Sequence, residues 1–99
     1  MISDHAKDRL KERCGLPKKA IERNVKTAFE QGIKHSECTG RLRKYLDYLF
    51  LSHKLATNIR LYGDTVYIFQ DENLITVFQL PKIYKKAVNK LSLKKNKGV

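Results

Sequence analysis

The sequence predicts one α+β domain, in which N-terminal helices pack on one face of a three- to four-stranded antiparallel sheet and a short C-terminal helix follows. Apolar residues recur at helical spacing in the first half of the chain, and after Asn58 the period changes to two, as in strands. Gly63 and Asp64 separate two such runs at the length of a two-residue hairpin turn. A chain of 99 residues suits a single domain, predicted over 1–93 with a basic tail at 94–99.

Two helices are predicted before Gly32. The first begins at Ser3 or Asp4, either of which can cap it, and ends at Gly15. Its apolar stripe consists of Ala6, Leu10 and Cys14. The second begins near Pro17, since a first turn does not need the N–H that proline lacks. Its buried face consists of Ile21, Val25, Ala28 and Phe29, and Gly32 is expected to take a left-handed conformation beyond its end.

A third segment has two interpretations. Apolar residues at helical spacing predict a helix from Gly40 to Leu51, with Leu42, Tyr45, Leu46 and Leu49 on its buried side. The alternative is a strand over Tyr45–Ser52, because this stretch is rich in β-compatible residues.

Three strands are predicted at Asn58–Tyr62, Thr65–Gln70 and Leu74–Leu80, and a final helix follows Pro81. The first turn pairs Arg60 with Tyr67 and Ile59 with Ile68. Matching apolar residues across the second turn places Ile68 opposite Val77.

This register divides the sheet into two faces of different character. The face expected to receive the helices carries Ile59, Leu61, Val66, Ile68, Ile75 and Val77. The other carries Asn58, Arg60, Tyr62, Tyr67, Phe69, Thr76 and Phe78. Aromatic, hydroxyl and arginine side chains on an open sheet are typical of single-stranded RNA recognition. The alternative is that these aromatic residues form a second core.

The charge indicates a polyanionic partner. The chain has 21 Lys and Arg against 10 Asp and Glu, for a net charge of +11. The basic residues are unevenly placed: residues 61–81 contain none, whereas residues 82–99 contain seven lysines and no acid. RNA is the expected partner ahead of DNA. The sequence contains no apolar run of membrane-spanning length, so we expect a cytoplasmic protein with no membrane partner.

The absence of several motifs narrows the chemistry. The sequence contains no phosphate-binding glycine loop, no Gly-x-Ser-x-Gly and no His-Glu-x-x-His. Cys14 and Cys38 do not have zinc-ligand spacing relative to the histidines, and reduced structural thiols are expected. No metal and no cofactor are predicted.

Three motifs together resemble a known group of proteins. His5-Ala6-x-x-Arg9-x-x-x-Arg13 precedes a Gly-Leu break, the buried positions of the second helix follow, and a strand reads Leu74-Ile75-Thr76-Val77-Phe78. This order resembles small toxin-like domains, carried by phages and mobile elements, of the barnase–EndoU–colicin–RelE ribonuclease fold. The resemblance implies helices on one face of an antiparallel sheet, RNA on the open face and, in many members, metal-independent endoribonuclease activity. The predicted helix between Gly32 and Asn58 departs from the early strands usual in the group.

Candidate catalytic residues follow from the needs of metal-free RNA cleavage, which are a base, an acid and cations beside the phosphate. His5, Arg9 and Arg13 share one stripe of the first helix, where the alternative is a solvated helix edge. His35, near Glu37, and His53, before the first hairpin strand, are further acid–base candidates. The predicted catalytic set is His5, Arg9 and His53. The predicted RNA-binding set is Arg13, Arg60, Tyr67, Thr76, Lys82, Lys85 and Lys86.

The leading functional prediction is an RNA-directed, ribonuclease-toxin-like protein, with metal-independent endoribonuclease activity as its specific form. The alternative is a non-catalytic nucleic-acid- or ribonucleoprotein-binding module, such as an inhibitor of a host defence nuclease. A protein partner, either an antitoxin or a host nuclease complex, is also predicted. A third hypothesis is a helix-turn-helix regulator. The connection between Gly32 and Thr39 argues against it, because it is longer than the usual turn of that motif.

Overall fold

The computed structural model describes residues 8, 12 and 18–97, and among these the side chains of 8, 12 and 20–94. The predicted first helix therefore lies outside the described residues except for Asp8 and Glu12. The elements that follow are α2 (Lys18–Gln31), β1 (Ile33–Lys34), the 3₁₀ helix η1 (His35–Glu37), α3 (Gly40–Ser52), β2 (Asn58–Tyr62), β3 (Thr65–Gln70), β4 (Asn73–Gln79), the 3₁₀ helix η2 (Lys82–Tyr84) and α4 (Lys85–Lys97). The predicted α+β class is confirmed, and the third segment is the helix rather than the strand.

Within the described residues, the sheet has the strand order β1-β2-β3-β4, with every neighbouring pair antiparallel. The register of β2 against β3 is the predicted one, with Ile59 opposite Ile68 and Arg60 opposite Tyr67. Gly63 has a φ of 60° in the turn between them, a conformation that glycine adopts without steric cost. The conformation of this two-residue turn therefore determines the register of β2 against β3, as the sequence predicted.

The register of β3 against β4 differs from the prediction because of a β-bulge. Ile68 lies opposite Thr76 and Phe69 opposite Leu74, so that Ile75 is an extra residue in β4. The predicted pairing of Ile68 with Val77 is wrong by one position. A one-residue shift moves side chains to the opposite face of the sheet. Val77 therefore lies on the same face as Tyr67, and Thr76 lies on the other face, opposite Ile68.

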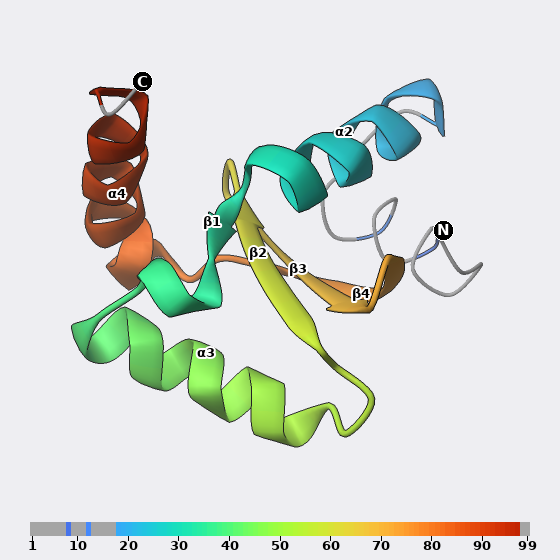
Figure 1. The fold of residues 1–99 in the computed structure, drawn as a ribbon, viewed down its shortest axis with the longest axis horizontal. Helices are drawn as coiled ribbons and strands as arrows, with labels where there is room; N and C mark the ends of the chain where they lie inside the picture. The colour runs from blue at the N-terminus through green and yellow to red at the C-terminus, as the bar shows by residue number, and fades with distance from the viewer. Residues whose placement is uncertain (1–7, 9–11, 13–17, 98–99) are drawn as a thin grey trace.

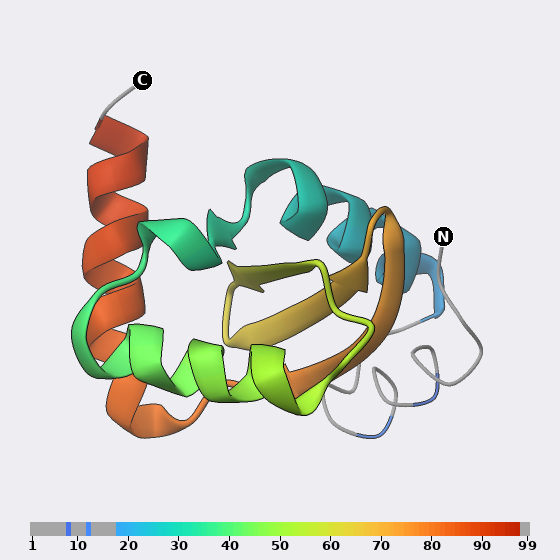
Figure 2. The same cartoon turned by 60° about the horizontal axis from the view of Figure 1, so that its bottom comes forward.

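Helices cover both faces of the sheet, with α2 on one side and α3 on the other (Figures 1 and 2). On the α2 side, a core forms from Ile21, Val25, Ala28, Tyr67, Phe69, Leu74 and Val77. Tyr67 is only 2% exposed and Phe69 is fully buried. The predicted open RNA-binding face is therefore wrong, and the alternative of a second core is confirmed. The physical reason is that the apolar stripe of α2 also has to be buried, and the aromatic face of the sheet covers it.

The opposite side holds a larger, mainly aliphatic core under α3 and the start of α4. Its buried members are Ile33, Cys38, Leu42, Leu46, Leu49, Ala56, Ile59, Leu61, Val66, Ile68, Leu80 and Val88. The rings of Tyr45 and Tyr84 stack with their centroids 4.9 Å apart, which joins α3 to η2. Helix α4 continues to Lys97, through residues that the sequence assigned to the basic tail.

Gly32 does not have the predicted left-handed conformation, since the glycines with positive φ among the described residues are Gly40 and Gly63. A Cβ at Gly32 would lie 2.4 Å from the Ala28 carbonyl oxygen and 3.1 Å from that of Leu61. The position therefore requires glycine because an added Cβ would collide with a carbonyl oxygen in the last turn of α2 and crowd one in β2, and not because of a left-handed backbone conformation.

The connection from α2 to α3 passes through β1, which pairs with β2. The two helices therefore lie on opposite faces of the sheet and cannot pack against each other as a helix-turn-helix. Among the described residues, none of the helices has the length and apolarity needed to cross a membrane.

Candidate functional site

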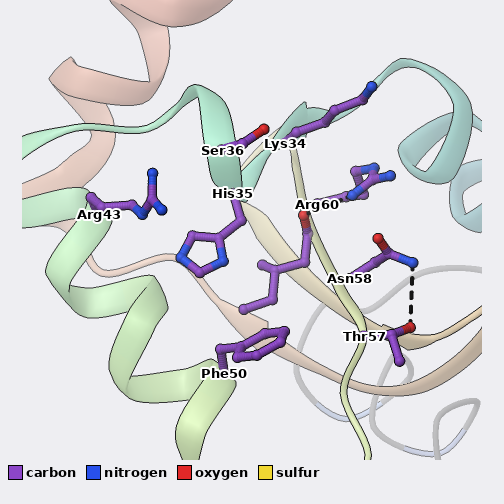
Figure 3. Close-up of a pocket in the computed structure, with 9 residues that line it drawn as sticks. Lys34, His35, Ser36, Arg43, Phe50, Thr57, Asn58 and Arg60 are labelled. Carbon is purple, nitrogen blue, oxygen red and sulfur yellow. Dashed lines mark hydrogen bonds between the residues drawn. The ribbon is translucent and has the colours of Figure 1, made fainter.

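A hollow of about 400 Å³ opens at the free edge of β2. Strand β1 is two residues long and pairs only with Arg60 and Leu61. In the described part of the chain, Asn58 and Ile59 therefore have no strand on their outer side. The residues that line the hollow come from β1, η1, α3, β2 and the position just before β2, as Figure 3 shows. They are Lys34, His35, Ser36, Arg43, Phe50, Thr57, Asn58, Ile59 and Arg60.

A histidine–carboxylate pair joins η1 to α3 beside this hollow. The Nε2 atom of His35 lies 2.6 Å from Oδ1 of Asp47, and the His35 side chain is 20% exposed. Arg43, one helical turn before Asp47, donates from Nε to the same oxygen at 3.2 Å. The hydrogen bond with His35, assisted by the one from Arg43, holds the pKa of the Asp47 carboxyl below its usual range.

The hydrogen bond with Asp47 determines which ring nitrogen of His35 can accept a proton. A carboxylate accepts hydrogen bonds only, so Nε2 carries the proton and Nδ1 of the neutral ring keeps its lone pair. Nδ1 makes no hydrogen bond to any residue that the structure describes. The Phe50 ring, with its centroid 5.7 Å away, packs beside the imidazole. His35 is therefore an oriented base of the kind that a histidine–aspartate pair provides.

Arg60 supplies a cation whose position is set by the backbone. Its Nε donates to the Phe29 carbonyl oxygen at 3.4 Å, and one terminal nitrogen donates to the Ile59 carbonyl oxygen at 3.2 Å. The guanidinium also lies over the Phe29 ring, 5.6 Å from its centroid. Partial burial lowers the pKa of Arg60, an effect that the charge of Glu37 opposes. An arginine remains cationic at neutral pH after such a shift.

Lys34 and Arg43 add charge from two other elements. Figure 3 shows the three basic side chains coming from β1, α3 and β2 around the hollow. The backbone N–H of Lys34 donates to Oε1 of Glu37 at 3.0 Å, which fixes the turn that carries His35. Because arginine and lysine bind phosphate oxygens well, the lining suits an anionic ligand that also meets a histidine base.

Only part of the predicted site is found in this hollow. Arg60 lies there, and so does His35, a candidate outside the predicted catalytic set. His53 follows the last turn of α3 with its ring 5.5 Å from that of Phe78, outside the lining of the hollow. Tyr67 and Thr76 are buried on opposite faces, so the predicted cluster of these two with Arg60 does not form.

The remaining predicted residues are separate from the hollow or outside the described residues. His5, Arg9 and Arg13 belong to the latter group. Lys82 and Lys86 are exposed in the η2–α4 region, and Nζ of Lys85 lies 3.4 Å from Oδ2 of Asp64.

Sequence reasoning missed Asp47, Arg43 and Lys34. The spacing of Arg43 and Asp47, four residues apart on a predicted helix, indicated that they could pair with each other. No local signal indicated that the pair would face His35. Comparison of the chain with models of known protein families, with curated proteins and with solved structures gives no match.

Proposed function

We propose that this protein binds single-stranded RNA in the hollow at the β2 edge and cleaves it without a metal ion, with His35 as the general base. The observation that carries the proposal is the 2.6 Å pairing of His35 with Asp47 beside a hollow lined by Lys34, Arg43 and Arg60. The net charge of +11 supports a polyanionic ligand. The same proposal includes membership of the toxin-like ribonuclease group that the sequence resembles.

The chemistry is a transesterification within the RNA strand. Nδ1 of His35 takes the proton of a ribose 2′-hydroxyl, whose oxygen attacks the adjacent phosphorus. The bond from phosphorus to the 5′-oxygen breaks, and that oxygen leaves with a proton from solvent. The products are a 2′,3′-cyclic phosphate and a free 5′-hydroxyl. Arg43 and Arg60 stabilise the negative charge that develops on the phosphorane oxygens.

The test is incubation of purified protein with a mixed single-stranded RNA pool in EDTA. We expect discrete fragments ending in 2′,3′-cyclic phosphate. His35→Ala should lower the cleavage rate by roughly 10²–10⁴, the usual contribution of a general base. His53→Ala is the matched control, because it removes a histidine outside the hollow and should leave the rate near that of the wild type. Equal rates for wild type and His35→Ala would reject the proposed base.

One observation favours the alternative function, a non-catalytic RNA-binding module. The described lining of the hollow contains one histidine, His35, and no carboxylate, whereas cleavage by acid and base often uses two proton-transferring groups. If RNA is retained but never cut in EDTA, the binding module becomes the better description. A protein partner, such as an antitoxin or a host nuclease complex, remains a prediction.

A further inference from the structure

Another hollow, of about 340 Å³, lies between the start of α3 and the η2–α4 segment. Its basic side chains are Arg41 from α3 and Lys86 and Lys90 from α4. Lys86 and Lys90 are one turn apart and so lie on the same face of α4. Among the described residues, no acidic side chain lines this groove. Three cations that converge without an anion favour a ligand that carries negative charge.

The groove also contains aromatic and apolar side chains, which a site for a small inorganic anion would not need. Tyr84 lines it, supported by its stack against Tyr45. Ile83, also in the lining, is 78% exposed. Aromatic and apolar side chains beside cations suit a nucleic-acid strand, whose bases pack while its phosphates pair. Thr39, which makes no side-chain capping bond to α3, adds a hydroxyl at the same place.

The two hollows flank the same turn of α3. Arg43 lines the first and shares its helix edge with Asp47 and the His35 pair, whereas Arg41 lines the second and shares its edge with Tyr45. Residues two apart on a helix point to nearly opposite sides, and their Cα atoms are about 5 Å apart. Figures 1 and 2 both show α4 beside the start of α3. A nucleic-acid strand that occupies both hollows therefore has to cross over α3 at this turn.

We infer that the groove formed by Arg41, Lys86 and Lys90 holds the RNA backbone next to the phosphate bound beside His35. The inference rests on the proposed function and gives its substrate class: an oligoribonucleotide that crosses the start of α3, rather than a dinucleotide. The first hollow binds the reacting phosphate, and the groove binds neighbouring phosphates without reading sequence.

The experiment compares RNA of two lengths that cannot be cleaved because every 2′-hydroxyl is methylated. An oligomer of about 12 nucleotides, within the span usual for single-strand sites, is titrated by fluorescence anisotropy. A dinucleotide is titrated by NMR chemical shifts. The test variant is Lys86→Ala/Lys90→Ala. The matched control is Lys26→Ala/Lys54→Ala, which removes the same charge from exposed positions outside both hollows.

We expect the groove variant to bind the oligomer about tenfold more weakly and to lower the salt slope by about 1.4, as loss of two phosphate contacts to a single strand predicts. Its affinity for the dinucleotide should be unchanged, and the control should retain most of its affinity for the oligomer. Wild-type affinity of the groove variant for the oligomer, or an equal loss in the control, would overturn the inference.

Arg60→Ala separates this inference from the proposed function. If Arg60→Ala weakens binding of both lengths while the groove variant does not, the groove inference fails and the proposed function stands. If neither RNA binds wild-type protein, both fail.

Discussion

The α2-covered face of the sheet and the free edge of β2 both carry residues that the sequence assigned to one open binding face, but the two regions differ in what covers them. On the face, Tyr67 and Phe69 lie under α2 and are shielded from solvent. At the edge, β1 ends after two residues and the β2 backbone borders a hollow with basic walls. Aromatic and basic residues in a strand are therefore available to a ligand only where no helix or strand covers them.

Arg60 and Tyr67 show this difference within one cross-strand pair. They lie directly opposite each other, yet Tyr67 is core whereas Arg60 lines the hollow. A long arginine stem can pass over an apolar ring and keep its charged end near water, and Arg60 does so over Phe29. The comparison predicts that substitutions on the face change folding, while substitutions at the edge change ligand binding.

Phe69→Ala should have the largest effect on stability. Phe69 is fully buried and its ring packs edge-on against Phe29 at 5.1 Å. We expect the free energy of unfolding to fall by about 3–5 kcal/mol, measured by urea denaturation. Ser36→Ala, an exposed change at the hollow, should alter it by less than about 0.5 kcal/mol. Similar values for the two variants would show that α2 does not seal this face.

Cys38 tests how closed the α3 core is near the hollow. Burial, together with the charge of Glu37, raises the pKa of the Cys38 thiol to about 11 from an ordinary 9.0. At pH 8 this lowers the thiolate fraction about 100-fold, and alkylation should be slower by about the same factor. The measurement is iodoacetamide labelling of a Cys14→Ser variant, folded and then in urea. Fast labelling of the folded protein would mean that the hollow extends to this thiol.

Gly32→Ala tests the packing at the end of α2, where an added Cβ would meet the backbone of α2 itself and, less closely, that of β2. An added Cβ would meet the backbone oxygen of Ala28 at 2.4 Å, so the helix end has to move. We expect a loss of about 1–3 kcal/mol in the free energy of unfolding, as for other overpacked sites. Gln31→Ala, at the exposed neighbouring position, is the control. An unchanged free energy of unfolding for Gly32→Ala would contradict this steric conflict.

Asp47→Asn should have the smallest effect on folding, and that effect should depend on pH. The pKa of Asp47 is lowered in the folded state, first by the hydrogen bond with His35. Its stabilising effect is therefore fully present above the ordinary aspartate pKa and disappears as the pH falls through the lower folded value. The melting temperature of the wild type should exceed that of Asp47→Asn near neutral pH, and the two should converge in acid. A constant difference at all pH values would indicate that the pairing with His35 does not contribute.

Much of the fold could be predicted because local patterns determine it. The bounds of β2 and β3 and their register agree with the prediction, since alternation and a glycine turn act over neighbouring residues. Helices α2 and α3 agree for the same reason. The strand β1 was missed, because two residues are too few to show a period.

The candidate site was harder to predict because its parts are distant in the chain. The sequence pointed to His35 as an acid–base candidate and to Arg60 as a candidate for RNA binding. Their common hollow depends on how η1, α3 and β2 meet, which no local period encodes. The bulge at Ile75 had a similar effect, since one extra residue exchanged the faces of Thr76 and Val77.

The sequence by itself determined the α+β class, the hairpin from β2 to β3, the apolar stripes of α2 and α3, and the basic charge. These are properties of neighbouring residues, governed by turn conformation, helical period and composition. Only the tertiary structure decided that α2 covers the face of Tyr67, and that the end of β1 leaves an open edge where His35, paired with Asp47, and Arg60 line one hollow. Burial depends on which elements pack together, and that choice is made by the free energy of the whole core rather than by any one segment.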